Sequence, residues 1–344
     1  MSDLFSLSFP NFNLKIKKQD GTTFTMSYHD FVDHILLLRE VINHPEMTQQ
    51  GEVLENFIKD YCGKMARQEM KFRHQQLKLP WQIDWIWHVH RLHPLAYYND
   101  CCKQLPDGEP VDQKVQKCPT NYSKQYEAAP PNLSTNCDVN FVPSIDLVQA
   151  VLRQCDFLDK FKKHVLYSWD LKKMNIFLFR QLMRNYALFM QLARPNDIIV
   201  PTFDIDLIWH THLRYPQHYR AFSIAVCGFV LNHDDSIETN ILTNAFQKTA
   251  DRWKKAYKSH MLQDVDKKIL QTSQYVSFHG MDLTSTYNET CEGTTSGCEL
   301  NDGGDCGLNG GDGGVSSCGG EGASSCGGGS SCGGGGCGGG CGGD

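Results

Sequence analysis

Apolar side chains recur at helical spacing through most of the chain between residues 28 and 260. One such stripe comprises Ile145, Val148, Leu152, Cys155 and Leu158. Similar stripes run through residues 174–189 and 242–257. Stripes of this period are typical of amphipathic helices, which bury their apolar faces against one another. The pattern therefore predicts a mainly all-α fold in which the helices pack as one helical domain.

Residues 12–26 follow a different pattern near the start of the chain. Apolar and polar positions alternate there on both sides of Gln19-Asp20-Gly21. Alternation interrupted by a glycine-containing turn is typical of two paired strands. We therefore expect a small β-hairpin ahead of the helices.

The sequence also contains an internal repeat. The segment DWIWHVH at 84–90 matches DLIWHTH at 206–212, and DFV at 30–32 resembles DLV at 146–148. The offset between the copies drifts from 116 to 122 positions, as it would if loops had gained residues. Repeats of this length indicate a duplicated structural unit.

These patterns predict two related helical units with a linker between them and a tail after them. In chain order the parts are an N-terminal hairpin segment (1–27), helical repeat 1 (28–127), a linker (128–143), helical repeat 2 (144–262) and a Gly/Cys-rich tail (280–344). Glycine dominates the tail and apolar residues are scarce, so burial could not offset the entropy lost on ordering it. We expect this tail to be disordered.

Charge separates the tail from the rest of the chain. All 33 lysines and arginines lie at or before Lys268, so the net charge of −6 comes from the acidic tail. The helical part has no concentrated basic patch, and this argues against nucleic-acid binding. No apolar run approaches the roughly 20 residues that span a bilayer, and the first residues lack the pattern of a signal peptide. We expect a cytoplasmic protein with reduced cysteines.

The matched blocks supply the first set of candidate metal ligands. On a helix, an aspartate and a histidine four positions apart share a face, and the carboxylate can fix the histidine tautomer. If the two repeats pair about a pseudo-twofold axis, their histidines could converge on zinc, copper or iron. The candidates are His88, His90, His210, His212, Asp84 and Asp206. Alternatively, these groups form a satisfied polar core where the helices meet.

The tail cysteines are a second candidate metal site. Cys326, Cys332, Cys337 and Cys341 lie among glycines, which leave room to wrap a soft ion. Thiolates favour zinc or Cu(I). Their spacing matches no standard zinc ribbon, however, and low-complexity drift is the alternative explanation.

Four segments resemble a known family. VPTFDIDLIWHTHLRYPQHY (200–219), LNHDDS (231–236) and FQKTADRWKKAY (246–257) are similar to the glycine-rich domain-containing protein family. IDWIWHVHRLHPLAYYNDC (83–101) resembles that family's upstream copy. The resemblance implies no established catalytic activity.

The sequence gives no sign of a reaction, because it lacks H-E-x-x-H, G-x-S-x-G and a P-loop. The first hypothesis is therefore a non-enzymatic interaction or scaffold protein with an unidentified protein partner. The alternative is a metal-binding protein that uses the histidine blocks, the tail cysteines, or both. A metalloenzyme at the same histidines is the third hypothesis.

Overall fold

The structure, a computed structural model, describes residues 9–17, 23–117, 141–261 and 299–302, and these are mainly helical as predicted. The helices are α1 (Tyr28–Ile42), α2 (Glu52–Ala66), α3 (Arg73–Gln76), α4 (Trp81–Arg91), α5 (Pro94–Gln104), α6 (Leu147–Lys163), α7 (Val165–Ser168), α8 (Ile176–Gln191), α9 (Phe203–Leu213), α10 (Pro216–Cys227) and α11 (Thr239–Tyr257), with the 3-10 turns η1 (Pro45–Met47) and η2 (Leu171–Lys173). Among the described helices, none combines the length and apolar character that a bilayer crossing requires.

The predicted hairpin is present. Strand β1 (Asn13–Lys17) pairs antiparallel with β2 (Thr23–Ser27). The inward positions of the hairpin are buried in the core, namely Leu14, Ile16, Phe24 and Met26. A third strand, β3 (Glu299–Asp302), pairs with the other edge of β1. This strand falls within the tail, for which we expected no regular structure.

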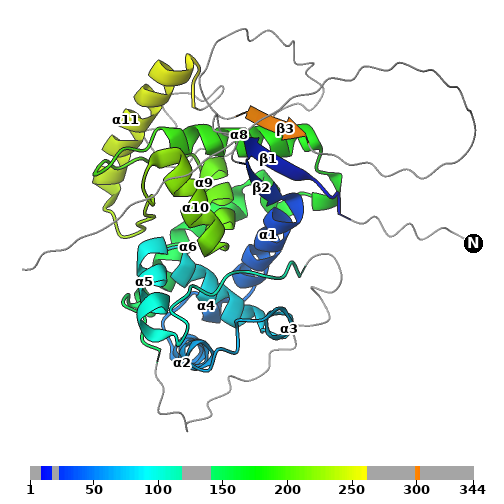
Figure 1. Cartoon of the computed structure of the whole chain (residues 1–344), viewed down its shortest axis with the longest axis vertical. Coiled ribbons are helices and arrows are strands. Elements are labelled where there is room, and N and C mark those ends of the chain that lie inside the picture. Colours follow the sequence, from blue (N-terminus) through cyan, green and yellow to red (C-terminus); the bar gives the residue numbers. More distant parts are fainter. Residues whose placement is uncertain (1–8, 18–22, 118–140, 262–298, 303–344) are drawn as a thin grey trace, which may run out of the picture. The chain divides into compact units, whose positions relative to one another are not determined.

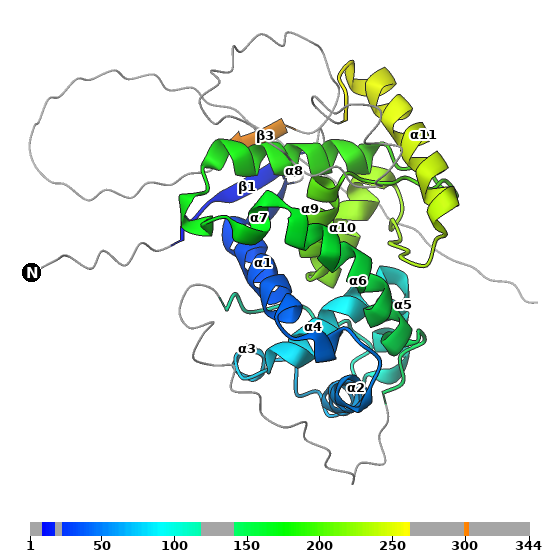
Figure 2. The same ribbon diagram turned by 180° about the vertical axis from the view of Figure 1, so that it is seen from behind.

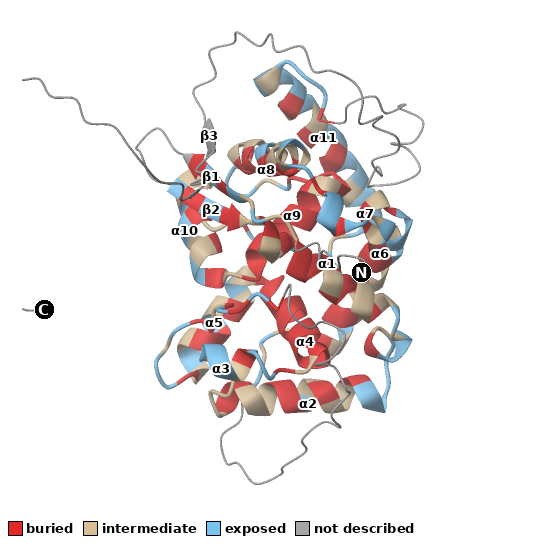
Figure 3. Cartoon of the chain, turned by 90° about the vertical axis from the view of Figure 1, so that its right-hand side faces the viewer, coloured by how far each residue is buried: buried red, intermediate tan, exposed pale blue. Residues whose placement is uncertain are grey.

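Helices α4 and α9 carry the two histidine blocks and form the centre of the helical part. Every residue of α4 is buried, and so is almost all of α9, as Figure 3 shows in red. Each helix has apolar or aromatic side chains on all sides, a composition that suits complete burial. Both end at the short turn before a proline, because Pro94 and Pro216 begin the next helices.

The remaining helices surround this pair in two groups. Helices α2 and α5 pack against α4, whereas α8 and α10 pack against α9. The first helix of each predicted repeat also packs against the other group (Figures 1 and 2). Helix α1 contacts α9 as well as α4, and α6 packs along α4. The two groups therefore share one hydrophobic core.

Candidate metal centre

The two histidine blocks make matching contacts. Trp87 donates its indole N–H to the hydroxyl of Tyr97 at 2.9 Å, and Trp209 donates to the hydroxyl of Tyr219 at 3.0 Å. Each tyrosine hydroxyl in turn donates to a backbone carbonyl. Each pair spans ten positions of sequence. These contacts agree with the predicted duplication.

His90, the second histidine of the first block, forms hydrogen bonds through both of its ring nitrogens. The hydroxyl of Tyr61 lies 2.8 Å from Nδ1 of His90, and Nε2 of His90 lies 3.1 Å from the Asp100 carboxylate. The carboxylate accepts the Nε2 proton, so the tyrosine donates to Nδ1. All donor and acceptor positions of this imidazole are used inside the protein.

The second histidine of the other block is satisfied in the same way by different residues. Nδ1 of His212 lies 2.8 Å from the Tyr186 hydroxyl, and its Nε2 lies 2.6 Å from Nδ1 of His218. The structure therefore does not bring His90 and His212 together, and we no longer regard them as ligands of one ion.

The first histidines of the two blocks do meet. The ring centroids of His88 and His210 lie 6.1 Å apart. His34 on α1 lies beside both rings, with its centroid 4.7 Å from that of His88 and 6.4 Å from that of His210. Among the described residues, neither ring nitrogen of His88 has a hydrogen-bond partner, although the side chain is fully buried. Of the four histidines that we expect from the sequence to converge, the structure thus brings together one from each block, His88 and His210.

Asp84 does not orient His88 as expected. Its carboxylate lies 3.3 Å from Nζ of Lys117, 3.3 Å from Nη2 of Arg214 and 3.6 Å from Nη2 of Arg91. Burial alone would raise the pKa of Asp84, but these three cations outweigh it and hold the pKa at about 2. The negative charge of Asp84 is thus balanced by cations of the protein itself. Asp84 is therefore no longer a candidate metal ligand.

Asp206, at the matching position in the second block, has no such neighbours. Its carboxylate lies 3.4 Å from Nε2 of His210, and among the described residues its ion-pair partners are histidines. Burial raises its pKa to about 8, against only a weak opposing effect of Lys160. Asp206 is therefore a buried carboxyl group without a protein cation beside it.

His233 completes a group of three with Asp206 and His210. Its Nε2 lies 2.9 Å from Nε2 of His210 and 3.9 Å from Oδ1 of Asp206. Within the part of the chain that the structure describes, this is the one set of three such residues whose ligand atoms all lie within 4.8 Å of one another. We did not predict His233, which lies in LNHDDS, because we used that segment only for the family resemblance.

The loop of residues 228–238, which we call the His233 loop, is held at two points. Gly228 ends α10 with a φ of +83°, a left-handed conformation that glycine adopts without strain. The carboxylate of Asp235 then accepts from Nε of Arg153 and Nε2 of Gln154, both at 2.7 Å. This second contact fastens the loop to α6 two residues beyond His233.

Burial also keeps the imidazoles of His210 and His233 uncharged. The low-polarity surroundings lower the pKa of His210 well below its usual value and that of His233 to about 4. Both imidazoles are then neutral near pH 7, the form that binds metal ions.

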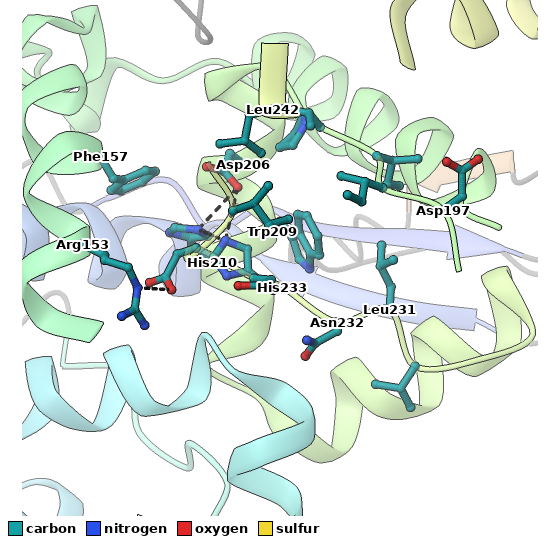
Figure 4. A pocket seen from close by; sticks show the side chains of 18 of the residues that line it. Arg153, Phe157, Asp197, Asp206, Trp209, His210, Leu231, Asn232, His233 and Leu242 are labelled. Carbon is teal, nitrogen blue, oxygen red and sulfur yellow. Dashed lines mark hydrogen bonds and ion pairs between the residues drawn. The ribbon is translucent and has the colours of Figure 1, made fainter. Parts of the chain in front are cut away.

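A cavity of about 470 Å³ opens beside this group (Figure 4). Asp206, His210 and His233 all contribute to its wall. His233 keeps 11% of its side chain exposed, so the three ligand atoms are not sealed from the cavity. The tail cysteines Cys326, Cys332, Cys337 and Cys341 lie outside the described residues.

Comparison with known proteins confirms the family resemblance. Residues 107–222 match the family model described as glycine-rich domain-containing protein-like. Glycine-rich domain-containing protein 1 of Arabidopsis thaliana is 28% identical over 259 residues, which are 65% of this chain and 31% of the relative. Glycine-rich domain-containing protein 2 of the same plant is 29% identical over 205 residues, 52% of this chain and 25% of the relative.

The chain thus spans less than a third of the length of either curated relative. No solved structure matches the chain. The names of the two relatives state neither a reaction nor a ligand, so the geometry of the site has to carry any functional argument.

Proposed function

We propose that this chain, which is similar to glycine-rich domain-containing proteins whose names state no activity, binds one divalent metal ion of the zinc class. The ligands are Asp206, His210 and His233. The observation that carries the proposal is a buried carboxyl group that faces two neutral imidazoles and, among the described residues, has no lysine or arginine as an ion-pair partner.

The spacing of the ligand atoms suits a small metal ion. A tetrahedral zinc ion with bonds of roughly 2.0–2.1 Å separates its ligand atoms by roughly 3.3 Å. The three separations in this group are 2.9, 3.4 and 3.9 Å, which bracket that value. Shifts of about half an ångström in the side chains would place all three atoms around one ion.

The duplicated position provides an internal comparison. In the first block, Asp84 is surrounded by Lys117, Arg91 and Arg214. In the second block, the same position holds Asp206 beside two imidazoles. Asp206 needs a nearby positive charge only when its buried carboxyl group ionises, and a bound metal ion would supply that charge.

The donor set also narrows the choice of metal. Two imidazoles and one carboxylate suit zinc or iron(II), whereas Cu(I) prefers thiolates and thioethers. Three protein ligands leave at least one position open. This arrangement differs from a closed structural zinc site, which has four protein ligands.

Metal analysis of full-length protein purified without chelator tests the proposal. We expect one equivalent of zinc or iron in the wild type and less than about a tenth of that in His233→Gln, because the third ligand is lost. His74→Gln, at an exposed position on α3, is the matched control and keeps its metal.

A variant with Cys326, Cys332, Cys337 and Cys341 changed to serine separates the two candidate sites. It should retain the metal of the wild type. Metal lost from this variant but kept in His233→Gln would assign binding to the tail and overturn the proposal, as would a wild type that holds no metal after incubation with zinc.

A scaffold role remains the second candidate function, and a separate observation favours it. His90 and His212 use their hydrogen-bonding groups inside the core, which suits a structural role. A protein partner would then bind elsewhere on the surface. Affinity capture with wild type and His233→Gln tests the two roles together, because a scaffold independent of metal would retain its partners in both.

A further inference from the structure

The cavity beside the proposed metal site has a mixed lining, and its apolar part adjoins two of the metal ligands. Its inner lining includes the side chains of Phe157, Trp209, Leu231, Val200, Ile199 and Leu242. Phe157 lies against His210, with ring centroids 4.4 Å apart, and Trp209 lies against His233 at 5.2 Å. Apolar surface therefore reaches directly to two of the three metal ligands (Figure 4).

Most of the charged residues that line the cavity belong to ion pairs, and of the others Arg194 and Asp234 carry opposite charges. Arg153 pairs with Asp235 at 2.7 Å. Two further aspartates that line the cavity, Asp156 and Asp197, are each paired with a lysine or an arginine. These ion pairs leave little net charge for the recognition of a ligand.

A bound metal ion would change this balance. Two positive charges from the metal, one negative charge from Asp206 and two neutral imidazoles leave one net positive charge. That charge would lie in a partly enclosed space beside Phe157 and Trp209, where electrostatic attraction is stronger than in water. The ion's open coordination position faces the same space, because all three ligands line the cavity.

From this juxtaposition, and resting on the metal site proposed above, we propose that the cavity binds a small monoanion with an apolar body, namely an aliphatic carboxylate whose oxygen completes the coordination of the metal. Carboxylate oxygen is a normal ligand of zinc. The volume of about 470 Å³ falls within the range of small-molecule sites. The apolar walls would contact the aliphatic chain.

Cobalt-loaded full-length protein provides a direct test, since the visible bands of Co²⁺ report changes in its coordination. The probe is octanoate, with acetate as a carboxylate that lacks the apolar body and octylamine as a cation of the same length. We expect octanoate to shift the bands saturably and to bind at least about tenfold more tightly than acetate, because each buried methylene adds affinity. Octylamine should leave the bands unchanged.

Two variants of adjacent residues on α11 test the role of the walls. Leu242→Asp places a negative charge in the cavity and should weaken octanoate binding at least tenfold while cobalt is retained. Ile241→Asp is the matched control, because Ile241 is 44% exposed and does not line the cavity. It should bind octanoate like the wild type.

The outcomes distinguish the two proposals. If no cobalt bands form, the metal site fails and the ligand proposal falls with it. If the bands form but octanoate leaves them unchanged, or binds no better than acetate, the metal site stands and the ligand proposal is overturned. An equal effect of Leu242→Asp and Ile241→Asp would also overturn it.

Discussion

At the scale of single residues, Asp84 and Asp206 hold matching positions in the two blocks but have different electrostatic surroundings. Asp84 neutralises three cations that are themselves buried. Asp206 faces imidazoles. The same residue type at the same repeat position can therefore contribute to stability in one copy and to ligand binding in the other.

This difference predicts unequal effects of the same substitution in metal-free protein. Asp84→Asn should lower the free energy of unfolding by about 3–5 kcal/mol, because it removes the carboxylate that three buried cations share. Asp206→Asn should change it by less than about 1 kcal/mol, because the amide replaces a carboxyl group that has no cation beside it. Urea unfolding in the presence of a chelator measures both, and equal losses would contradict the argument.

The pH dependence of stability supplies a second prediction for Asp84. Its pKa is about 2 in the folded protein and 3.8 in the unfolded chain. A lowered pKa means that the contribution of Asp84 is fully present above pH 3.8 and is lost as the pH falls through 2. We expect ~2 kcal/mol of the difference between wild type and Asp84→Asn to disappear between about pH 4 and pH 2.

Denaturant unfolding of the two proteins across that range measures the change. A difference between wild type and Asp84→Asn that stays constant from about pH 4 to pH 2 would show that the cations do not act through this carboxylate.

At the scale of elements, the His233 loop depends on its contact with α6. Asp235→Asn weakens the contact with Arg153, so His233 should be less well positioned and zinc affinity should fall about tenfold. The free energy of unfolding should change by less than about 1 kcal/mol, because the contact is partly exposed. Competition with a chelator gives the affinity.

The neighbouring Asp234 provides the control for this prediction. Its carboxylate is exposed and bonds to Ser236 within the loop. Asp234→Asn should leave zinc affinity unchanged, and equal losses in the two variants would indicate a general effect of loop charge instead.

The elements that sequence could predict are those fixed by local pattern. Helical periodicity, the alternation on both sides of Gly21 and the prolines that follow the histidine blocks depend on neighbouring residues, and each predicted element formed. The candidate site was only partly predictable. Lys117 and Arg214 reach Asp84 from distant parts of the chain, and His233 reaches His210 through a loop whose path depends on tertiary contacts.

At the scale of the whole molecule, the first helix of each predicted repeat packs against the other repeat. Helix α1 contacts α9, and α6 packs along α4. Arg214 of the second repeat also pairs with Asp33 and Asp84 of the first. The helices of both predicted repeats therefore contribute to one core.

This arrangement predicts that the halves fold only together. Fragments 1–127 and 144–262 should each lack cooperative thermal unfolding, because each would expose the apolar surface that the other covers. Mixed in equal amounts, they should form a complex with restored helicity. Circular dichroism of the fragments alone and mixed measures this, and a sharp unfolding transition in either fragment alone would contradict it.

The pairing of Arg214 with Asp33 and Asp84 has a consequence for how the protein is made. A ribosome synthesises the first half of the chain, with Asp33, Asp84 and Arg91, well before it reaches Arg214. While only the first half has emerged, the nascent chain has neither α6 nor α9 to cover α4, and it exposes aromatic side chains that are buried in the folded protein. We therefore expect the first half to complete its folding only after α9 has been synthesised, and the emerging first half to bind chaperones that recognise exposed apolar segments.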